Sequence, residues 1–170
     1  MLAGFAGGFR RSELAALRVE DLETTAEGFI ARLRRSKTDQ EGQGRAVALP
    51  YGSDPATCPV RAVRAWLEQA GITSGPLFRA IGRPGLVRER PLHADSVGYL
   101  VKRAVGRAGL ERAGYAGHSL RAGLVTQAAM NGASEWASMK QTGHHSLATV
   151  RKYIREGSLF RDNDASKLGL

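Results

Sequence analysis

The order of apolar and polar residues divides the first third of the chain into short helical and extended segments. Residues 1–6 predict the end of a helix, and a second short helix is expected at 12–17, where Leu14 and Leu17 share one face. Residues 29–34 and 45–49 have the composition of strands, and the turn-rich stretch between them predicts a β-hairpin at about 29–49. Because a helix rarely starts without a cap, we expect an upstream portion of this unit to be missing.

Helical periodicity dominates the remainder of the chain. Residues 73–92, rich in Gly, Pro and Arg, predict a surface loop with short extended pieces. Ser119, Ser134 and Ser146 are the expected N-caps of the last three helices. The helices are predicted at 59–70, 95–108, 119–130, 134–141 and 146–155. Together these segments predict an α+β fold, mainly helical, with a small antiparallel sheet.

Length and charge narrow the class of protein. A chain of 170 residues is the size of one domain. Its net charge is +9, and 20 of its 25 cationic residues are Arg, which binds phosphate bidentately and favours a nucleic-acid partner. A coding sequence rich in G and C would also raise Arg, Ala and Gly together. Cys58 is the single cysteine, which fits a reducing cytosol, and we expect a cytoplasmic protein without a membrane or targeting segment.

Two short strings contain most of the candidate chemistry. His118-Ser-Leu-Arg121 lies at the start of a predicted helix, where free backbone N–H groups and the helix dipole favour an anion. In the second string, Ser146 and Tyr153 are two helical turns apart, which would bring His144 and Tyr153 to one place. Taken singly, each group also has an ordinary interpretation, such as a solvated cation or, for Tyr153, a core aromatic.

The full candidate set supplies the groups needed to attack a DNA phosphodiester without a metal ion. It contains guanidinium groups, a lysine, imidazoles, a carboxylate and a phenol, contributed by Arg10, Glu13, Lys37, His118, Arg121, His144 and Tyr153. We find no His, Cys and acid cluster with metal-ligand spacing and no phosphate-binding P-loop, so no metal or other cofactor is expected.

These residues occur in strings that resemble the catalytic domain of tyrosine recombinases, also called phage-type integrases. The strings are Gly8-Phe-Arg10-Arg-Ser-Glu-Leu14, Ser36-Lys37-Thr38, Gly117-His118-Ser-Leu-Arg121 and Thr142-Gly143-His144 followed by Tyr153. They run in order over residues 1–156, which the resemblance identifies as the catalytic domain. The segment 157–170 would then be a C-terminal tail whose Leu159, Phe160 and Leu168 suit docking on a neighbouring protomer or packing on their own domain.

The resemblance assigns a role to each candidate. Tyr153 would be the nucleophile, forming a 3′-phosphotyrosine and freeing a 5′-hydroxyl. Arg10, Arg121 and His144 would bind the phosphate, although the adjacent His145 is an alternative to His144. The resemblance further implies that Lys37 protonates the leaving oxygen, that His118 assists proton transfer at the phenol, and that Glu13 orients the site through His118 or Arg10. Arg34, Arg35 and Arg151 are candidates for contact with the DNA backbone.

The resemblance implies site-specific recombination of double-stranded DNA by self-associated protomers, four in the family. Two alternatives stay open. One is a truncated remnant that binds DNA without recombining, because the family's N-terminal DNA-clamping domain is not found in the sequence. The other is a type IB topoisomerase, against which the small size and the Gly143-His144 string argue.

Overall fold

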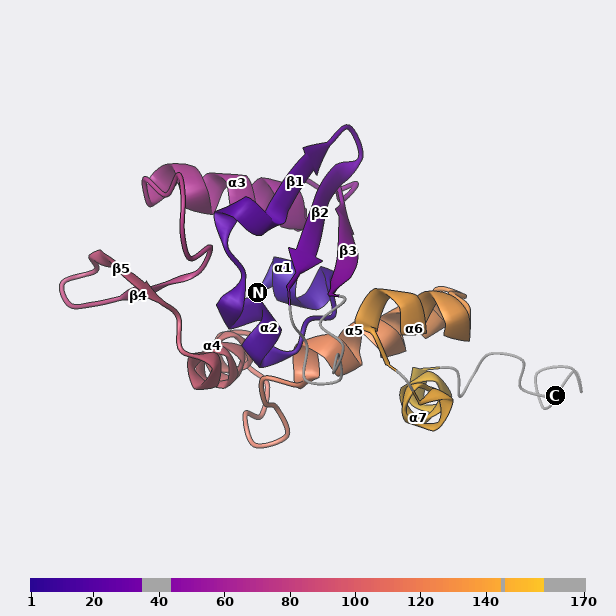
Figure 1. Cartoon of the computed structure of the whole chain (residues 1–170). Helices are drawn as coiled ribbons and strands as arrows, with labels where there is room; N and C mark the ends of the chain where they lie inside the picture. The colour runs from indigo at the N-terminus through magenta and orange to yellow at the C-terminus, as the bar shows by residue number, and fades with distance from the viewer. Residues whose placement is uncertain (35–43, 145, 158–170) are drawn as a thin grey trace, which may run out of the picture.

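The computed structural model describes residues 1–34, 44–144 and 146–157 of the chain (Figure 1). The described elements confirm an α+β fold that is mainly helical, with the expected small antiparallel sheet. The predicted positions Arg35, Lys37 and His145 lie outside the described residues, as does the tail beyond residue 157.

The hairpin predicted from alternating residues is present and is extended by a third strand. Strand β2 (Gly28–Leu33) pairs antiparallel with β3 (Arg45–Pro50), and β1 (Leu22–Thr25) pairs with the other edge of β2. The sequence did not predict β1, because this strand is only four residues long. The two residues of its turn to β2, Ala26 and Glu27, are also not the Asn, Gly or Pro that usually mark a turn. The buried face of β2 and β3 presents Phe29, Leu33 and Val47 to the core.

The N-terminal helices cover this core and lead directly into the site. Helix α1 (Leu2–Ala6) packs on α3 (Pro59–Gln69), while α2 (Arg11–Ala16) packs on α4 (Ala94–Arg107). A single 3-10 turn at Val19–Asp21 connects α2 to β1. Between α1 and α2 lies Phe9, which is 2% exposed and inserts into the core immediately before Arg10.

The loop predicted at 73–92 contains the short extended pieces that were expected. These are β4 (Arg79–Ile81) and β5 (Val87–Pro91), which form a separate two-stranded sheet. In Figure 1 this hairpin projects away from the three-stranded sheet, on the side of α3 and α4.

The three C-terminal helices form a layer that connects to the rest of the molecule through α1 and β3. Helix α5 (Ser119–Met130) packs on α1 and on α7 (Leu147–Gly157), and α6 (Glu135–Thr142) contacts α5, α7 and β3 (Figure 1). The start of α5, the end of α6 and the start of α2 are held close together by hydrogen bonds, although more than 100 residues separate α2 from the other two.

The capping of these helices differs from the sequence prediction at one place. Ser134 caps α6 as expected, with its hydroxyl accepting from the Ala137 amide at 3.1 Å. At α5, however, the N-cap is His118, and the prediction of Ser119 was wrong. The Ser119 hydroxyl instead accepts from the backbone amide of Ala116 at 2.9 Å, so it is used by the preceding turn.

Within the described part of the chain, none of the helices combines the length and the apolar character needed to cross a membrane.

We predict that replacing the cap residue Ser134 with Ala lowers the free energy of unfolding by about 1 kcal/mol, because the Ala137 amide loses its acceptor. Urea unfolding followed by circular dichroism measures this change. The matched control Ser134→Asp keeps an acceptor at the same position and should stay close to wild type. Equal losses of stability in Ser134→Ala and Ser134→Asp would show that the missing acceptor is not the cause and would contradict the prediction.

Candidate active site

The site is built around the buried carboxylate of Glu13, in the first turn of α2. Its side chain is 2% exposed. Its Oε2 accepts from the backbone amide of Arg10 at 2.9 Å, and its Oε1 accepts from Nη1 of Arg10 at 2.6 Å. This pairing is local, because Arg10 is the N-cap of α2 and Glu13 is the third residue of the helix. Of the two orienting roles expected for Glu13, the hydrogen bonds described here run to Arg10.

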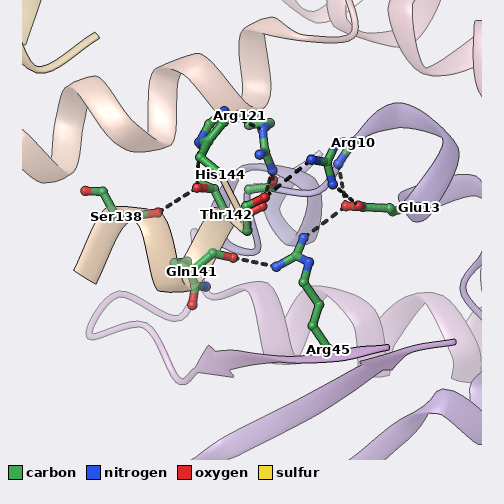
Figure 2. Close-up of polar contacts among 10 residues, drawn as sticks. Arg10, Glu13, Arg45, Arg121, Ser138, Gln141, Thr142 and His144 are labelled. Atoms are coloured by element: carbon green, nitrogen blue, oxygen red, sulfur yellow. Dashed lines mark hydrogen bonds and ion pairs between the residues drawn. The ribbon is translucent and has the colours of Figure 1, made fainter. Parts of the chain in front are cut away.

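A second arginine, Arg45, binds the same carboxylate and was not predicted from the sequence. Its Nη2 lies 3.0 Å from Oε2 of Glu13, and its Nη1 donates to the carbonyl of Gln141 at 2.8 Å (Figure 2). Arg45 is the first residue of β3, so this one side chain connects the sheet, α2 and the end of α6. Burial lowers the pKa of its guanidinium, while Glu13 opposes that shift.

The turn after α6 brings His144 to the same place. Gly143 ends α6 in the left-handed conformation, with φ of +66°, which favours glycine. A Cβ atom there would lie 2.9 Å from Nε of Arg45, so the close approach of Arg45 also requires glycine. The Gly143 carbonyl accepts from Nη2 of Arg10 at 3.3 Å, which ties this turn to α2.

Arg121, in the first turn of α5, is the most deeply buried charged residue of the set, at 1% exposed. Its Nη1 donates to the carbonyls of Gly8 and Thr142, and its Nε donates to Nε2 of His144 at 3.3 Å (Figure 2). Its Nη2 is buried and has no hydrogen-bond partner among the described residues. Burial and the field of Arg10 lower the pKa of Arg121 to about 10.

Burial, followed by the field of Arg121, also lowers the pKa of His144 to about 4. The imidazole is therefore neutral at pH 7. Its second nitrogen, Nδ1, lies 2.7 Å from the hydroxyl of Thr142. Thr142 was quoted in the string that contains His144, but no role was assigned to it from the sequence.

His118 and Tyr153 form the second part of the site. Nε2 of His118 lies 2.7 Å from the phenol oxygen of Tyr153, although the residues are 35 positions apart. Burial lowers the pKa of His118, and the fields of Arg121 and Arg10 lower it further. A neutral imidazole can accept the phenol proton. Tyr153 in turn acts on the pKa of Arg121, so the pair lies within electrostatic reach of the buried guanidinium.

The local charge balance makes the site suited to an anion. Glu13 pairs with Arg10 and Arg45, whereas Arg121 has no carboxylate partner among the described contacts. The charge around the unpartnered Nη2 of Arg121 is therefore net positive. Within the described residues there is no group of three or more His, Cys, Asp or Glu side chains that could hold a metal ion. The arrangement can bind an oxyanion next to a hydrogen-bonded phenol.

The remaining candidates lie at other places or outside the described part. Arg34 is exposed, and its Nε donates to Asp21 at 2.7 Å. Arg151 is exposed and binds Glu135 at 3.0 Å, which raises its pKa. Both therefore already have an acidic partner.

Comparison with known proteins gives a consistent result. The phage integrase family model matches residues 1–158. An integrase/recombinase xerD homolog of Selenomonas ruminantium is 44% identical over 165 residues, covering 97% of this chain and 48% of that protein. The chain thus spans about half the length of this curated relative.

Solved structures agree in fold. A XerH site-specific recombinase bound to a palindromic difH substrate, in a post-cleavage complex, matches with a TM-score of 0.71 at 22% identity, over 97% of this chain and 44% of that one. A XerA recombinase matches with a TM-score of 0.68 at 20% identity, over 95% of this chain and 56% of that one. A dimer of lambda integrase residues 75–356 bound to a COC′ core site has a TM-score of 0.58 at 18% identity, covering 90% of this chain and 50% of that one.

We predict that Glu13→Gln destabilises the protein more than Arg45→Met does. The first change leaves two buried guanidinium groups without their shared counter-charge, which costs about 3–5 kcal/mol. The second removes one buried cation and leaves Glu13 paired with Arg10, so we expect a loss of roughly 1–3 kcal/mol. Urea unfolding measures both. Arg32→Met, which breaks an exposed pair with Glu23, is the control, and a Glu13→Gln loss no larger than that of the control contradicts the prediction.

We also predict that His144 makes folding sensitive to acid. Its pKa falls from an ordinary value of 6.5 to about 4 in the folded protein, so below pH 6.5 the unfolded chain binds a proton that the folded chain does not. The free energy of unfolding should therefore decrease by roughly 1–3 kcal/mol between pH 7 and pH 4 on account of this residue.

The stability difference between wild type and His144→Gln, measured by denaturant titration at several pH values, isolates this contribution. As the pH falls, the free energy of unfolding of wild type should decrease more than that of His144→Gln. The exposed His93, replaced in the same way, serves as the control. A pH-independent difference for His144→Gln would refute the assignment.

Proposed function

The chain belongs to the phage integrase family, and from that premise we propose that its site cleaves and rejoins DNA strands in site-specific recombination. Tyr153 is the proposed nucleophile and His118 its proton acceptor. The observation that carries the proposal is the 2.7 Å contact between the Tyr153 phenol and the His118 imidazole. Beside this pair lies the buried Arg121, whose Nη2 has no hydrogen-bond partner among the described residues.

The proposed cleavage step exchanges one phosphodiester for another. The phenol oxygen of Tyr153 attacks the phosphorus, and its proton passes to Nε2 of His118. The bond from phosphorus to the 5′-oxygen breaks, which leaves a 3′-phosphotyrosine and a 5′-hydroxyl once the leaving oxygen takes a proton. The resemblance assigns that proton to Lys37. Rejoining reverses these steps with a 5′-hydroxyl from the same or another strand, and it needs no external energy source because the phosphotyrosine keeps the bond energy.

The arginines supply the electrostatic part of the proposed mechanism. A phosphate between Arg10 and Arg121 would accept from the free Nη2 of Arg121, and charge building up on its non-bridging oxygens in the transition state would be offset. Each charge-assisted hydrogen bond of this kind contributes roughly 1.5–3 kcal/mol. The net positive charge of the site supports this assignment.

Tyr153 makes its contact with His118 of the same chain. Double-stranded DNA and further copies of the chain are the proposed partners, four protomers in the active assembly, with segment 157–170 as the proposed docking segment between them. We also keep Arg34 and Arg151 as proposed contacts to the DNA backbone, where each would share its guanidinium between a phosphate and its present acidic partner.

A second candidate function is DNA binding without recombination. It is favoured by the net charge of +9, since arginine-rich basic surfaces bind DNA phosphates without any chemistry. Such binding would depend on salt, and log K would fall with log salt by about 0.9 for each phosphate contact.

We predict that the chain forms a covalent adduct with a nicked suicide substrate, a DNA duplex that on cleavage loses the short fragment with the free 5′-hydroxyl and so prevents rejoining. The adduct should resist denaturation and appear as a band of lower mobility. Tyr153→Phe should abolish it, and His118→Gln should slow its formation by roughly 10²–10⁴-fold, because the phenol loses its proton acceptor.

Tyr99→Phe is the matched control, because Tyr99 is 67% exposed and lies away from the site. It should form the adduct at the rate of wild type. No adduct from wild type, despite measurable DNA binding, would favour the binding remnant. Relaxation of supercoiled DNA without exchange between two labelled duplexes would instead indicate a topoisomerase.

A further inference from the structure

Helix α6 ends in three consecutive backbone carbonyls that each accept a hydrogen bond from a different arginine (Figure 2). The carbonyls belong to Gln141, Thr142 and Gly143, and their donors are, in that order, Arg45, Arg121 and Arg10. The last carbonyls of a helix have no acceptor role inside the helix, and they form the negative end of its dipole. The end of α6 therefore attracts and directs three guanidinium groups without contributing a carboxylate.

The side chain of Gln141 fixes where this end of α6 lies. Its Nε2 donates to the carbonyl of Ala6 at 2.9 Å and to the carbonyl of Ala48 at 2.9 Å. Ala6 is the last residue of α1, and Ala48 lies in β3. A side-chain amide has two N–H donors, so both are used. One half-buried side chain thus joins α6 to a helix and to a strand that are remote from it in the sequence.

The bond to Ala6 acts on the surroundings of Arg121. Ala6 is two residues before Gly8, and the carbonyl of Gly8 is one of the two acceptors of Nη1 of Arg121. The other acceptor is the carbonyl of Thr142, the residue next to Gln141. The hydrogen bond between Gln141 and Ala6 therefore sets the spacing of the two backbone segments between which this guanidinium is held.

The bond to Ala48 acts on Arg45 in the same way. Ala48 is three residues after Arg45 in β3, and Nη1 of Arg45 donates back to the main-chain carbonyl of Gln141 at 2.8 Å. The side chain and the main chain of Gln141 are thus both bound to the same stretch of strand. Because Nη2 of Arg45 binds Glu13, the position of the strand relative to α6 also affects the shared carboxylate.

We propose that Gln141 is a positioning residue, which joins the end of α6 to α1 and β3 so that Arg121 and Arg45 are held in the direction that the bound anion requires. The inference rests on the proposed function only in taking that anion to be the scissile phosphate. Gln141 acts through the two arginines and needs no contact with the phosphate itself. Without its side-chain bonds the arginines keep their acceptors, but those acceptors can move relative to one another, and alignment is lost.

Three substitutions separate the donors of Gln141 from its shape. Gln141→Met keeps the length of the side chain and removes both donors. Gln141→Glu keeps the shape, and at neutral pH its carboxylate can only accept, so it serves even where the Met variant does not fold. Gln127→Met is the matched control, because Gln127 is exposed and donates to Asn131 of the neighbouring helical turn.

The first measurement is NMR of the ¹⁵N-labelled folded protein at pH 7, with the Arg121 signals identified by their loss in Arg121→Lys. Wild type and Gln127→Met should show Nη1 hydrogens of Arg121 that exchange slowly with solvent, because two carbonyls hold them. In both Gln141 variants this exchange should be faster. A merely structural role would lower the unfolding temperature without changing these signals, so a folded Gln141 variant with the wild-type Arg121 signals would overturn the proposal.

The suicide-substrate assay separates this proposal from the proposed function. At saturating DNA, adduct formation in the two Gln141 variants should be slower by roughly 10-fold, because misaligned arginines stabilise the transition state less well. The DNA concentration for half-saturation should stay that of wild type. If the Arg121 signals change as expected but wild type forms no adduct, the positioning role stands and the recombinase function fails. If wild type and the Gln141 variants form the adduct at equal rates, the positioning role is refuted and the function stands.

Discussion

The buried carboxylate of Glu13 is the interaction on which the rest of the site depends. It accepts from Arg10 within its own helical turn and from Arg45 at the start of β3. Arg45 also donates a hydrogen bond to the carbonyl of Gln141 at the end of α6. Three parts of the chain are thereby fixed around one charge. Because a buried carboxylate without cations, or buried cations without a carboxylate, would be strongly unfavourable, the three segments are stable in this arrangement only together.

The same arrangement leaves the site with unsatisfied positive charge. Arg121 is almost completely buried, is held by backbone carbonyls and a neutral imidazole, and has no carboxylate of its own among the contacts described. Neutral acceptors fix the direction of a guanidinium without cancelling its charge, so that charge stays available to a bound oxyanion. The low pKa values of His118 and His144 have the same origin, since burial next to arginines disfavours further protons. One electrostatic condition therefore favours both anion binding and a neutral imidazole at the phenol.

Local sequence patterns predicted most of the elements. Alternating residues located β2 and β3, Pro59 and the glycine stops bounded the helices, and the Ser134 cap was identified from its residue type. The failures have local causes. Strand β1 is too short to show an alternation, and the Ser119 hydroxyl is taken by the turn before α5. The candidates that the structure brings together belong to recognisable strings, as with Arg10, Glu13, His118, Arg121, His144 and Tyr153. Arg45 was missed, because a single Arg after a turn carries no distinguishing pattern. Thr142 was part of a quoted string but received no role, because a Thr at a helix end does not by itself indicate a contact.

The sequence by itself determined the elements, the basic character, the family resemblance and the residue types available for chemistry, because each of these is encoded within a short stretch or a motif. Only the tertiary structure decided which groups meet. Arg45 is 32 residues from Glu13 and 96 from Gln141, and His118 is 35 from Tyr153. The contact of Arg121 with His144, 23 residues further along the chain, was also decided there. Hydrogen bonds and burial depend on distance in space, and the packing of α5, α6 and α7 against α1 and β3 sets those distances.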